Sequence, residues 1–156
     1  MSKSTPKDTS RIRNKKARHR FEVLQTVECG LSLAGSEVKS LRAGQASLDE
    51  AFARIRGNEV WLLGMHIAPY SHAGNAGHVP TRARKLLLHR REIEKWTAKV
   101  TQQGLTLVPL EVYFNARGLA KVQLALVRGK SHHDKRQDLK KREHQREIAR
   151  VVRRGG

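Results

Sequence analysis

The positive charge of this chain is concentrated at its two ends, and this distribution limits the part of the chain that can fold around an apolar core. The formal net charge is +18 over 156 residues. Residues 1–20 hold eight Lys or Arg and one Asp, and residues 130–156 hold ten Lys or Arg against four Asp or Glu. Residues 21–129 carry a net charge of only +5. The sequence therefore predicts one modest domain, residues 13–129, between two basic arms.

The two arms are too polar to bury a core of their own. Residues 1–12 are rich in Ser, Lys, Thr and Pro and are predicted to form a disordered N-terminal arm. The C-terminal tail, residues 130–156, has only four large aliphatic residues, Leu139, Ile148, Val151 and Val152. Its Lys, Arg, Glu and Gln favour helix, but so few apolar groups cannot hold an isolated helix. We expect the tail to be disordered in isolation and helical when a partner neutralises its charge.

The region between the arms has the patterns of short strands. Apolar side chains alternate over residues 21–29, and two β-prone runs flank the turn Gly57-Asn58, which indicates a hairpin. A second hairpin is predicted over residues 105–128, in which Pro109 requires an edge or a bulge. The five or six predicted strands indicate a mainly β fold, a small antiparallel β-barrel related to the oligonucleotide-binding fold.

Two helices and one long loop interrupt the predicted strands. A short helix is predicted over residues 36–44, with Ser36 as its N-cap and Gly44 at its end. A longer helix is predicted within residues 86–104, with His89 at its cap position and a buried stripe of Ile93, Trp96 and Val100. Residues 70–85 are predicted to be a loop.

The residues that carry catalytic or metal chemistry form no recognisable set. His66, His72 and His78 are six residues apart, which does not match the spacing of zinc ligands on one element. Residues 21–129 hold only nine carboxylates, too scattered for a two-metal nuclease. No phosphate-binding loop is present. The sequence therefore predicts no enzyme, no metal and no cofactor.

The charge indicates a phosphate polymer as the partner. No apolar run approaches the roughly 18 residues that span a bilayer, so a membrane partner is not expected. The single cysteine, Cys29, excludes an internal disulfide and fits a reducing, cytoplasmic compartment. Basic runs at residues 11–20, at residues 81–85 and in the tail fit nucleic acid, although any one of them alone is equally consistent with a solubilising surface.

Six motifs occur in a fixed order: NKKARH, GSEVKSLRAG, IAPY, PTRARKLLLH, GLTLVPLEVYF and GKSHHDKR. Together they resemble the small protein B family, the SsrA-binding proteins of bacterial trans-translation, over residues 13–154. The resemblance implies a barrel that binds the tRNA-like domain of transfer-messenger RNA and mimics an anticodon arm on ribosomes stalled without a stop codon. It implies a tail that enters the decoding centre and messenger channel of 16S rRNA. It also implies an indirect association with elongation factor Tu through the charged RNA.

The resemblance also implies two sets of site residues. The surface for transfer-messenger RNA would contain Asn14, Lys15, Glu28, Lys39, Arg42, Arg82, Arg84, Lys85 and Leu87. The ribosome-binding set in the tail would contain Lys130, His133, Asp134, Lys135, Arg136, Val151 and Val152. Ser131 stands where the family usually has a second lysine. From the residues alone, Glu28 would be a structural partner for a cation and Leu87 would belong to the core.

Two other functions remain open at this point. The same basic arms would suit a ribosomal protein or a ribosome-assembly factor that binds rRNA, and they would also suit a general RNA chaperone. The paired motifs GSEVKSLRAG and TRARKLLLH, together with the tail, favour the first interpretation, because neither alternative requires them.

Overall fold

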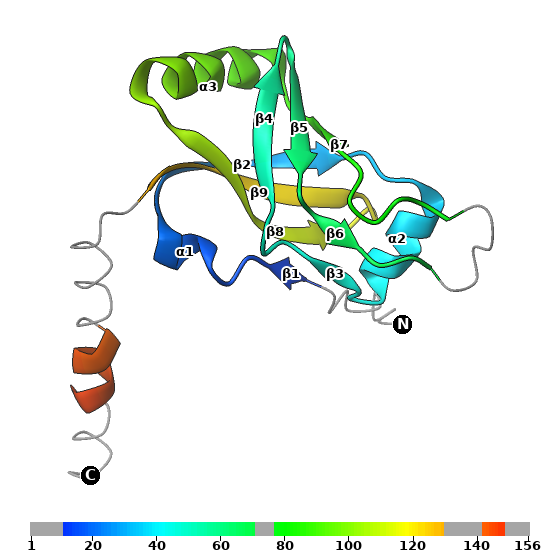
Figure 1. The fold of residues 1–156 in the computed structure, drawn as a ribbon, viewed down its shortest axis with the longest axis horizontal. Helices are drawn as coiled ribbons and strands as arrows, with labels where there is room; N and C mark the ends of the chain where they lie inside the picture. The colour runs from blue at the N-terminus through cyan, green and yellow to red at the C-terminus, as the bar shows by residue number, and fades with distance from the viewer. Residues whose placement is uncertain (1–10, 71–76, 130–141, 149–156) are drawn as a thin grey trace.

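The computed structural model describes residues 11–70, 77–129 and 142–148, and Figure 1 shows their arrangement. The elements in chain order are β1 (Ile12–Arg13), α1 (Ala17–Arg20), β2 (Phe21–Leu31), α2 (Gly35–Arg42), β3 (Ala46–Ser47), β4 (Phe52–Arg56), β5 (Glu59–Leu63), β6 (His66–Ile67), β7 (Arg84–Leu87), α3 (Arg90–Gln103), β8 (Thr106–Phe114) and β9 (Ala120–Gly129). Residues 142–148 form a further helical segment whose side chains are all exposed.

The main sheet closes on itself and forms the predicted barrel. Its strand order is β1-β8-β4-β5-β7-β2-β9, and the additional pairing of β8 with β9 completes the ring. Every strand pair is antiparallel. Strand β1 is an extra strand on β8, and β3 pairs separately with β6. A closed ring leaves few free edges, which is one way in which small β proteins avoid edge-to-edge aggregation.

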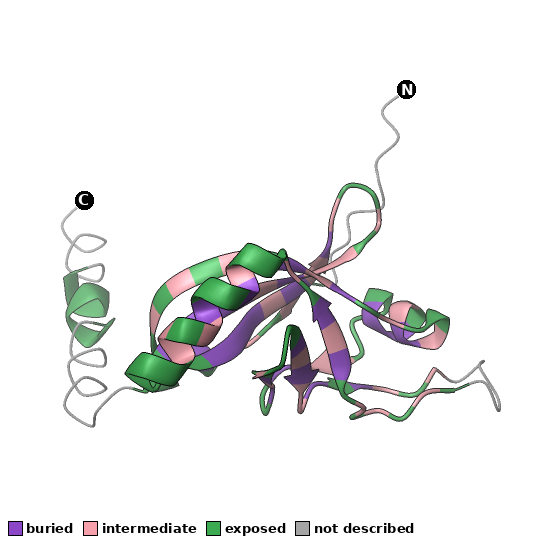
Figure 2. Ribbon diagram, turned by 90° about the horizontal axis from the view of Figure 1, so that it is seen from above, coloured by how far each residue is buried: buried purple, intermediate pink, exposed green. Residues whose placement is uncertain are grey.

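The apolar core lies inside the ring, where Figure 2 shows the buried surface of the strands. Its members come from every barrel strand and include Leu62, Leu86, Val122 and Leu124, each at most 1% exposed. Strands β4 and β8 pair only through Ala53 and Leu107. Helix α3 contributes Ile93 and Trp96 to the same core, as its periodicity predicts, and Val100 packs against it partly buried.

A bulge in β2 changes which side of the sheet its apolar residues occupy. Val23 pairs with Val127 whereas Gln25 pairs with Leu126, so Leu24 is an extra residue in this strand. Phe21 and Val23 therefore pack into a second, smaller apolar cluster outside the barrel, together with Ala17, Val108, Leu110, Ala125 and Val127. Val27 and Cys29, beyond the bulge, pack into the barrel core.

Strand β8 has a matching bulge next to its proline. Pro109 pairs with Leu124 and Glu111 pairs with Gln123, which leaves Leu110 as the extra residue. The prediction that Pro109 requires an edge or a bulge is therefore confirmed, because proline lacks the N–H that a regular ladder needs. The bulge also places Val108 and Leu110 in the second cluster.

Two predicted helix boundaries need correction. Helix α2 begins at Gly35 with Ala34 as its N-cap, not Ser36, and the Glu37 carboxylate accepts a 2.8 Å hydrogen bond from the Ala34 N–H. The Ser36 hydroxyl instead lies 2.9 Å from Nδ1 of His78. Helix α3 begins at Arg90 after His89, and the preceding residues, predicted as the end of a loop and the start of a helix, form β7. These residues form a strand because they pair with β5 and β2, which lie far away in the sequence.

The expected limits of the two arms also differ from the structure. Ile12 pairs with Val112, so regular structure begins inside the arm predicted to end at residue 12. Residues 142–148 are helical, and the expectation that the tail is disordered in isolation stays a prediction. The segment contains Arg, Glu and Gln, whose high helix propensity explains the conformation. The structure has more strands than predicted because β1, β3 and β6 are only two residues long and because β7 was predicted as loop and helix.

Candidate nucleic-acid interface

One row of side chains crosses the outside of the barrel over four neighbouring strands. Gly30 of β2 pairs with Leu87 of β7 on one side and with Lys121 of β9 on the other, and Lys121 pairs with Tyr113 of β8. Directly paired residues point to the same face of a sheet. The row therefore combines an apolar group, a cation and an aromatic ring on one continuous surface.

Leu87 is exposed because its neighbour in the row has no side chain. Leu87 is 54% exposed, an unusual position for a leucine in a strand. A Cβ atom added at Gly30 would lie 3.2 Å from Cβ of Leu87, so the glycine lets the leucine lie flat against β2. The structure therefore places Leu87 on the surface and not in the core, as the family resemblance implied.

A second row contains Glu28, the acidic residue that the resemblance assigns to RNA binding. Glu28 of β2 pairs with Gln123 of β9, which pairs with Glu111 of β8. The Tyr113 hydroxyl reaches from the first row and donates a hydrogen bond to the Glu28 carboxylate. This contact fixes the orientation of Glu28 while leaving its side chain exposed.

The guanidinium of Arg11 stacks on the ring of Tyr113. Its guanidinium lies 4.9 Å from the centroid of the Tyr113 ring and donates a 2.5 Å hydrogen bond to Glu111. Partial burial, followed by the hydrogen bond to Glu28 and the charges of Glu28 and Glu111, raises the pKa of Tyr113 to about 12. Tyr113 is therefore a neutral phenol that donates to Glu28 at any physiological pH.

Lys39 and Arg42 lie on α2, and Arg42 contacts the turn between β8 and β9. The Arg42 guanidinium lies 4.3 Å from the centroid of the Phe114 ring, next to Tyr113 in β8, and Nη2 lies 3.4 Å from the Gly118 carbonyl. Lys39 lies over the ring of Tyr70 at 5.3 Å. Both side chains are exposed, so their charges remain accessible to a phosphate backbone.

The basic motif TRARK divides between the surface and the interior. Successive residues of a strand point to opposite faces, so Lys85 faces outward and Arg84 inward. Lys85 lies near Leu87 and makes a 3.3 Å, solvent-exposed ion pair with Glu59. Arg82 precedes the strand, with its side chain 37% exposed.

Arg84 is not available to RNA, and its predicted role there is wrong. Its side chain is fully buried and donates to the Glu37 carboxylate, to the Met65 carbonyl at 2.8 Å and to the Pro80 carbonyl at 2.9 Å. A buried guanidinium needs partners for its donors, and these three contacts supply them. Arg84 therefore ties α2, β7 and the segment before β7 together.

Glu37 is the centre of this buried network. It is 0% exposed and accepts hydrogen bonds from both Arg82 and Arg84 as well as from the Ala34 N–H. Burial alone would raise the pKa of the carboxyl, but the hydrogen bonds from Arg82, Ala34 and Arg84 hold it below the ordinary value. Arg82 is therefore partly committed to structure and only its outer part faces solvent.

Asn14 makes structural contacts, whereas Lys15 makes none with the residues that the structure describes. The Asn14 side chain donates to the Pro109 carbonyl at 3.0 Å, and its backbone N–H donates to the Leu110 carbonyl at 2.8 Å. These bonds fasten the N-terminal segment to the bulge in β8. Lys15 is exposed beside this anchor.

The predicted ribosome-binding residues of the tail lie outside the described residues: Lys130, His133, Asp134, Lys135, Arg136, Val151 and Val152. Within the described ranges, no group of three His, Cys, Asp or Glu side chains is placed to hold a metal ion. None of the helices in those ranges is long and apolar enough to cross a membrane.

Two residues of this surface were not predicted from the sequence, Tyr113 and Lys121, and Arg11 was predicted only as a member of the basic run at residues 11–20. Tyr113 and Lys121 lie in the second hairpin, where strand alternation alone marks them as facing outward. Their position beside Glu28 and Leu87 depends on the pairing of β9 with both β2 and β8. No local pattern contains that information, because β2 and β9 are separated by most of the chain.

A family model, sequence relatives and a solved structure all match this chain. A family model described as SmpB protein matches residues 11–154. The chain is 51% identical over 152 residues to an SsrA-binding protein of Rhodopirellula baltica, covering 97% of this chain and 86% of the relative. It is 56% identical over 137 residues to an SsrA-binding protein of Chlorobium chlorochromatii, covering 88% and 87%.

A solved structure has the same fold. It is described as "tmRNA-SmpB: a journey to the center of the bacterial ribosome", and the matched chain is 50% identical with a TM-score of 0.66. The match covers 79% of this chain and 86% of that chain. With a family match over residues 11–154 and relatives about half identical along most of their length, this chain belongs to the SmpB family.

Proposed function

We propose that this protein binds the tRNA-like domain of transfer-messenger RNA and delivers it to ribosomes stalled without a stop codon. The observation that carries the proposal is the 50% identity to a chain from a structure of tmRNA and SmpB on the bacterial ribosome. Relatives called SsrA-binding proteins, which match nearly the whole chain, support the same partner. In this function the protein is a binding protein of the cytoplasm, not an enzyme.

The outer face of the barrel has the chemistry that the proposal requires. Lys121, Lys85 and Arg42 supply cations for phosphates, which give affinity without sequence readout. Exposed Leu87 supplies an apolar surface for an unstacked base or a ribose. Glu28, oriented by Tyr113, is an acceptor for base amino groups or a ribose 2′-hydroxyl, and such contacts distinguish folded RNA by shape.

The tail would act separately from the barrel. Ten Lys or Arg in residues 130–156 suit a channel lined with rRNA phosphates, where charge neutralisation favours helix. As the family resemblance implies, we expect residues 130–136 to bind at the decoding centre and Val151 and Val152 to form an apolar foothold further along the messenger channel.

A gel-shift comparison tests the proposal. The purified protein is titrated into a transcript of the tRNA-like domain, a tRNA and a fragment of 16S rRNA of similar length, at a fixed salt concentration. Preferential binding to the tRNA-like domain supports the proposal. Equal affinity for the three RNAs indicates an RNA chaperone, and preference for the rRNA fragment indicates a ribosomal or assembly protein.

A further inference from the structure

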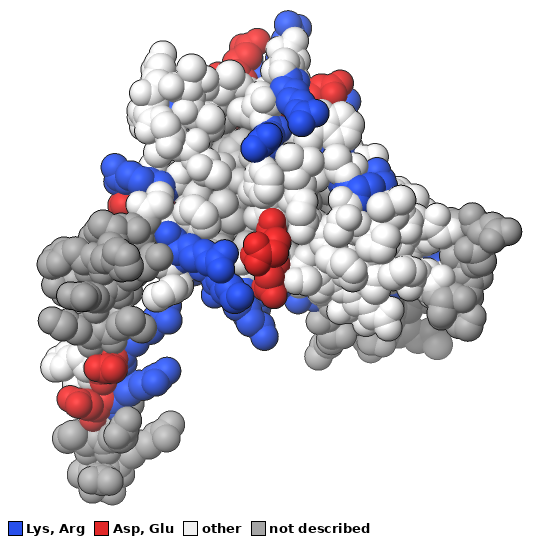
Figure 3. All heavy atoms as spheres, in the orientation of Figure 1, with Lys and Arg blue, Asp and Glu red and all other residues white. Residues whose placement is uncertain are grey.

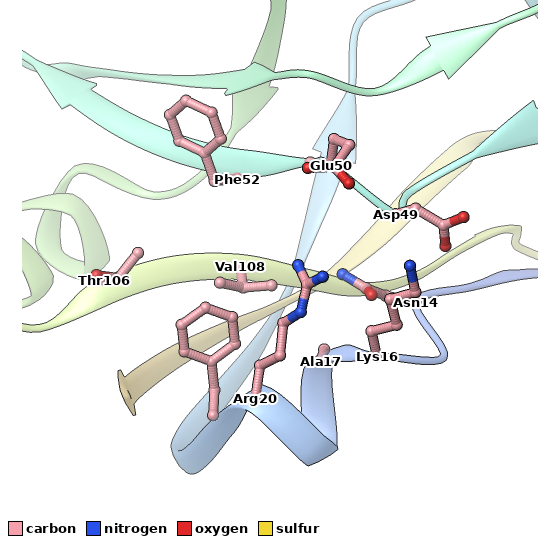
Figure 4. Close-up of a pocket in the computed structure, with 11 residues that line it drawn as sticks. Asn14, Lys16, Ala17, Arg20, Asp49, Glu50, Phe52, Thr106 and Val108 are labelled. Carbon is pink, nitrogen blue, oxygen red and sulfur yellow. The ribbon is translucent and has the colours of Figure 1, made fainter. Parts of the chain in front are cut away.

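The structure has a concave surface at the opposite end of β2 from Glu28. Figure 3 shows basic atoms directly beside acidic atoms on the face that contains α1 and the start of β4. Between these groups lies a pocket of about 190 Å³, shown in Figure 4. We infer that this pocket is an RNA-binding site that accepts one unstacked nucleotide. The inference relies on the proposed function only for the kind of polymer bound.

The apolar wall of the pocket suits a base. Phe21, Phe52 and Val108 line it. The two phenylalanine side chains are only partly buried. Arg54, which does not line the pocket, lies over the Phe52 ring at 5.4 Å from its centroid. Stacking of a base on an aromatic side chain is worth about 1–3 kcal/mol and is the usual way in which proteins hold single-stranded bases.

The polar wall carries both signs of charge. Lys16 and Arg20 lie on the α1 side, and Asp49 and Glu50 lie across from them in the turn before β4. Among the described residues, none of these four side chains has an ion pair or a hydrogen bond. Cations and carboxylates that share a cavity without neutralising one another suit a ligand that has both an anion and hydrogen-bond donors.

A nucleotide has that combination of groups. Its phosphate would lie on Lys16 and Arg20, and its base amino group or ribose 2′-hydroxyl would donate to Asp49 or Glu50. The bulge in β2 assists this arrangement, because it turns Phe21 to the outside of the barrel. Phe21 and Glu28 are seven residues apart, roughly 23 Å along a strand, so the pocket lies apart from Glu28. Of the residues that the resemblance assigns to transfer-messenger RNA, Asn14 lines the pocket.

Neutralising the two carboxylates tests the inference, because the two interpretations predict opposite changes in RNA affinity. Asp49 and Glu50 repel phosphates, so if they only line a charged surface, Asp49→Asn with Glu50→Gln should tighten RNA binding. If they accept hydrogen bonds from a bound nucleotide, the same substitutions should weaken it, by about tenfold for the loss of one or two charge-assisted bonds. Substitution of Lys16 or Arg20 gives no such distinction, because losing a cation weakens any RNA complex.

The experiment uses the full chain and two RNA partners, a transcript of the tRNA-like domain and purified small ribosomal subunits. The control is Glu22→Gln with Glu94→Gln, which removes two exposed carboxylates that neither line the pocket nor lie in the tail. About tenfold weaker binding of the pocket variant to one partner, with the control unchanged or tighter, supports the inference and identifies the RNA that supplies the nucleotide. Binding as tight as wild type or tighter to both partners overturns it. Failure of the wild type to bind the transcript counts against the proposed function instead, and the arm with small subunits still tests the pocket.

Discussion

The hydroxyl of Tyr113 donates a hydrogen bond to the carboxylate of Glu28 across β9, the strand that separates them in the barrel. Tyr113→Phe removes this bond but keeps the ring on which Arg11 stacks. We expect affinity for the tRNA-like domain to fall about threefold to tenfold, the effect of freeing one charge-assisted hydrogen bond. A filter-binding titration measures the change. Wild-type affinity would show that RNA binding does not depend on the orientation of Glu28.

Alkaline pH should affect the wild type more than the Tyr113→Phe variant. The pKa of Tyr113 is raised from 10 to about 12 in the folded protein, so the neutral phenol is the form that folding favours. The stability that this contributes is present below pH 10 and is lost as pH rises from 10 to 12. Urea unfolding at pH 9, 10, 11 and 12 should show a steeper fall for the wild type. Parallel curves for the two proteins would contradict the assignment.

Breaking the buried ion pair should be severe. Glu37→Gln leaves the Arg84 guanidinium buried without its counter-charge, and removing one partner of such a pair costs about 3–5 kcal/mol. The matched control is Glu94→Gln, which breaks the exposed pair with Arg90 and should cost less than about 1 kcal/mol. Free energies of unfolding from denaturant titration check both values. Similar losses in the free energy of unfolding for the two variants would show that the buried network does not depend on Glu37.

The exposed leucine of the barrel should matter for RNA and not for folding. Leu87→Asp places a carboxylate beside phosphates at a site that is 54% exposed, so RNA affinity should fall at least tenfold with little change in melting temperature. Ile148→Asp is the matched control, because Ile148 is 51% exposed in the tail. That variant should bind the tRNA-like domain normally. A large drop in melting temperature for Leu87→Asp would instead place Leu87 in the core.

Changes in the tail should separate RNA binding from ribosome rescue. Replacement of Asp134, Lys135 and Arg136 by Ala, or of Val151 and Val152 by Asp, should abolish tagging of a nascent chain on a message without a stop codon. Affinity for the tRNA-like domain should stay at the wild-type level, because the barrel alone would bind it. Lys140→Ala or Lys141→Ala should have little effect on tagging, since neighbouring cations can replace a single screened phosphate contact. Wild-type tagging by the double Asp variant would refute the apolar foothold.

Local sequence was sufficient to predict the barrel class, both hairpins and the longer helix. Alternation, the turn Gly57-Asn58 and the left-handed Gly104 are features of a few adjacent residues, and each was found where predicted. The bulge in β8 was predicted for the same reason, because Pro109 lacks the N–H that pairing requires.

The site was less predictable because its residues come together through pairing over long distances. Arg84 and Lys85 look alike in the motif TRARK, yet one is 0% exposed and the other lies on the surface. Whether each side chain is buried depends on how β7 pairs with β5 and β2. It also depends on Glu37, which lies 47 residues away from Arg84. The pocket beside α1 depends on a one-residue bulge at Leu24, and no turn residue or proline nearby predicts that bulge.

The position of β9 between β2 and β8 has a consequence for how fast this chain can fold. Phe21 pairs with Gly129, so the ring closes only when residues separated by most of the domain meet. Pairings of such high sequence separation slow folding, because the entropy of closing a long loop is lost before the contacts form. Chains are synthesised from the N-terminus at about 5–20 residues per second. The edge of β2 that pairs with β9 therefore stays unpaired for several seconds, until β9 has been synthesised. Folding of the barrel is therefore a late event in the synthesis of this protein, and β9 is the strand that completes it.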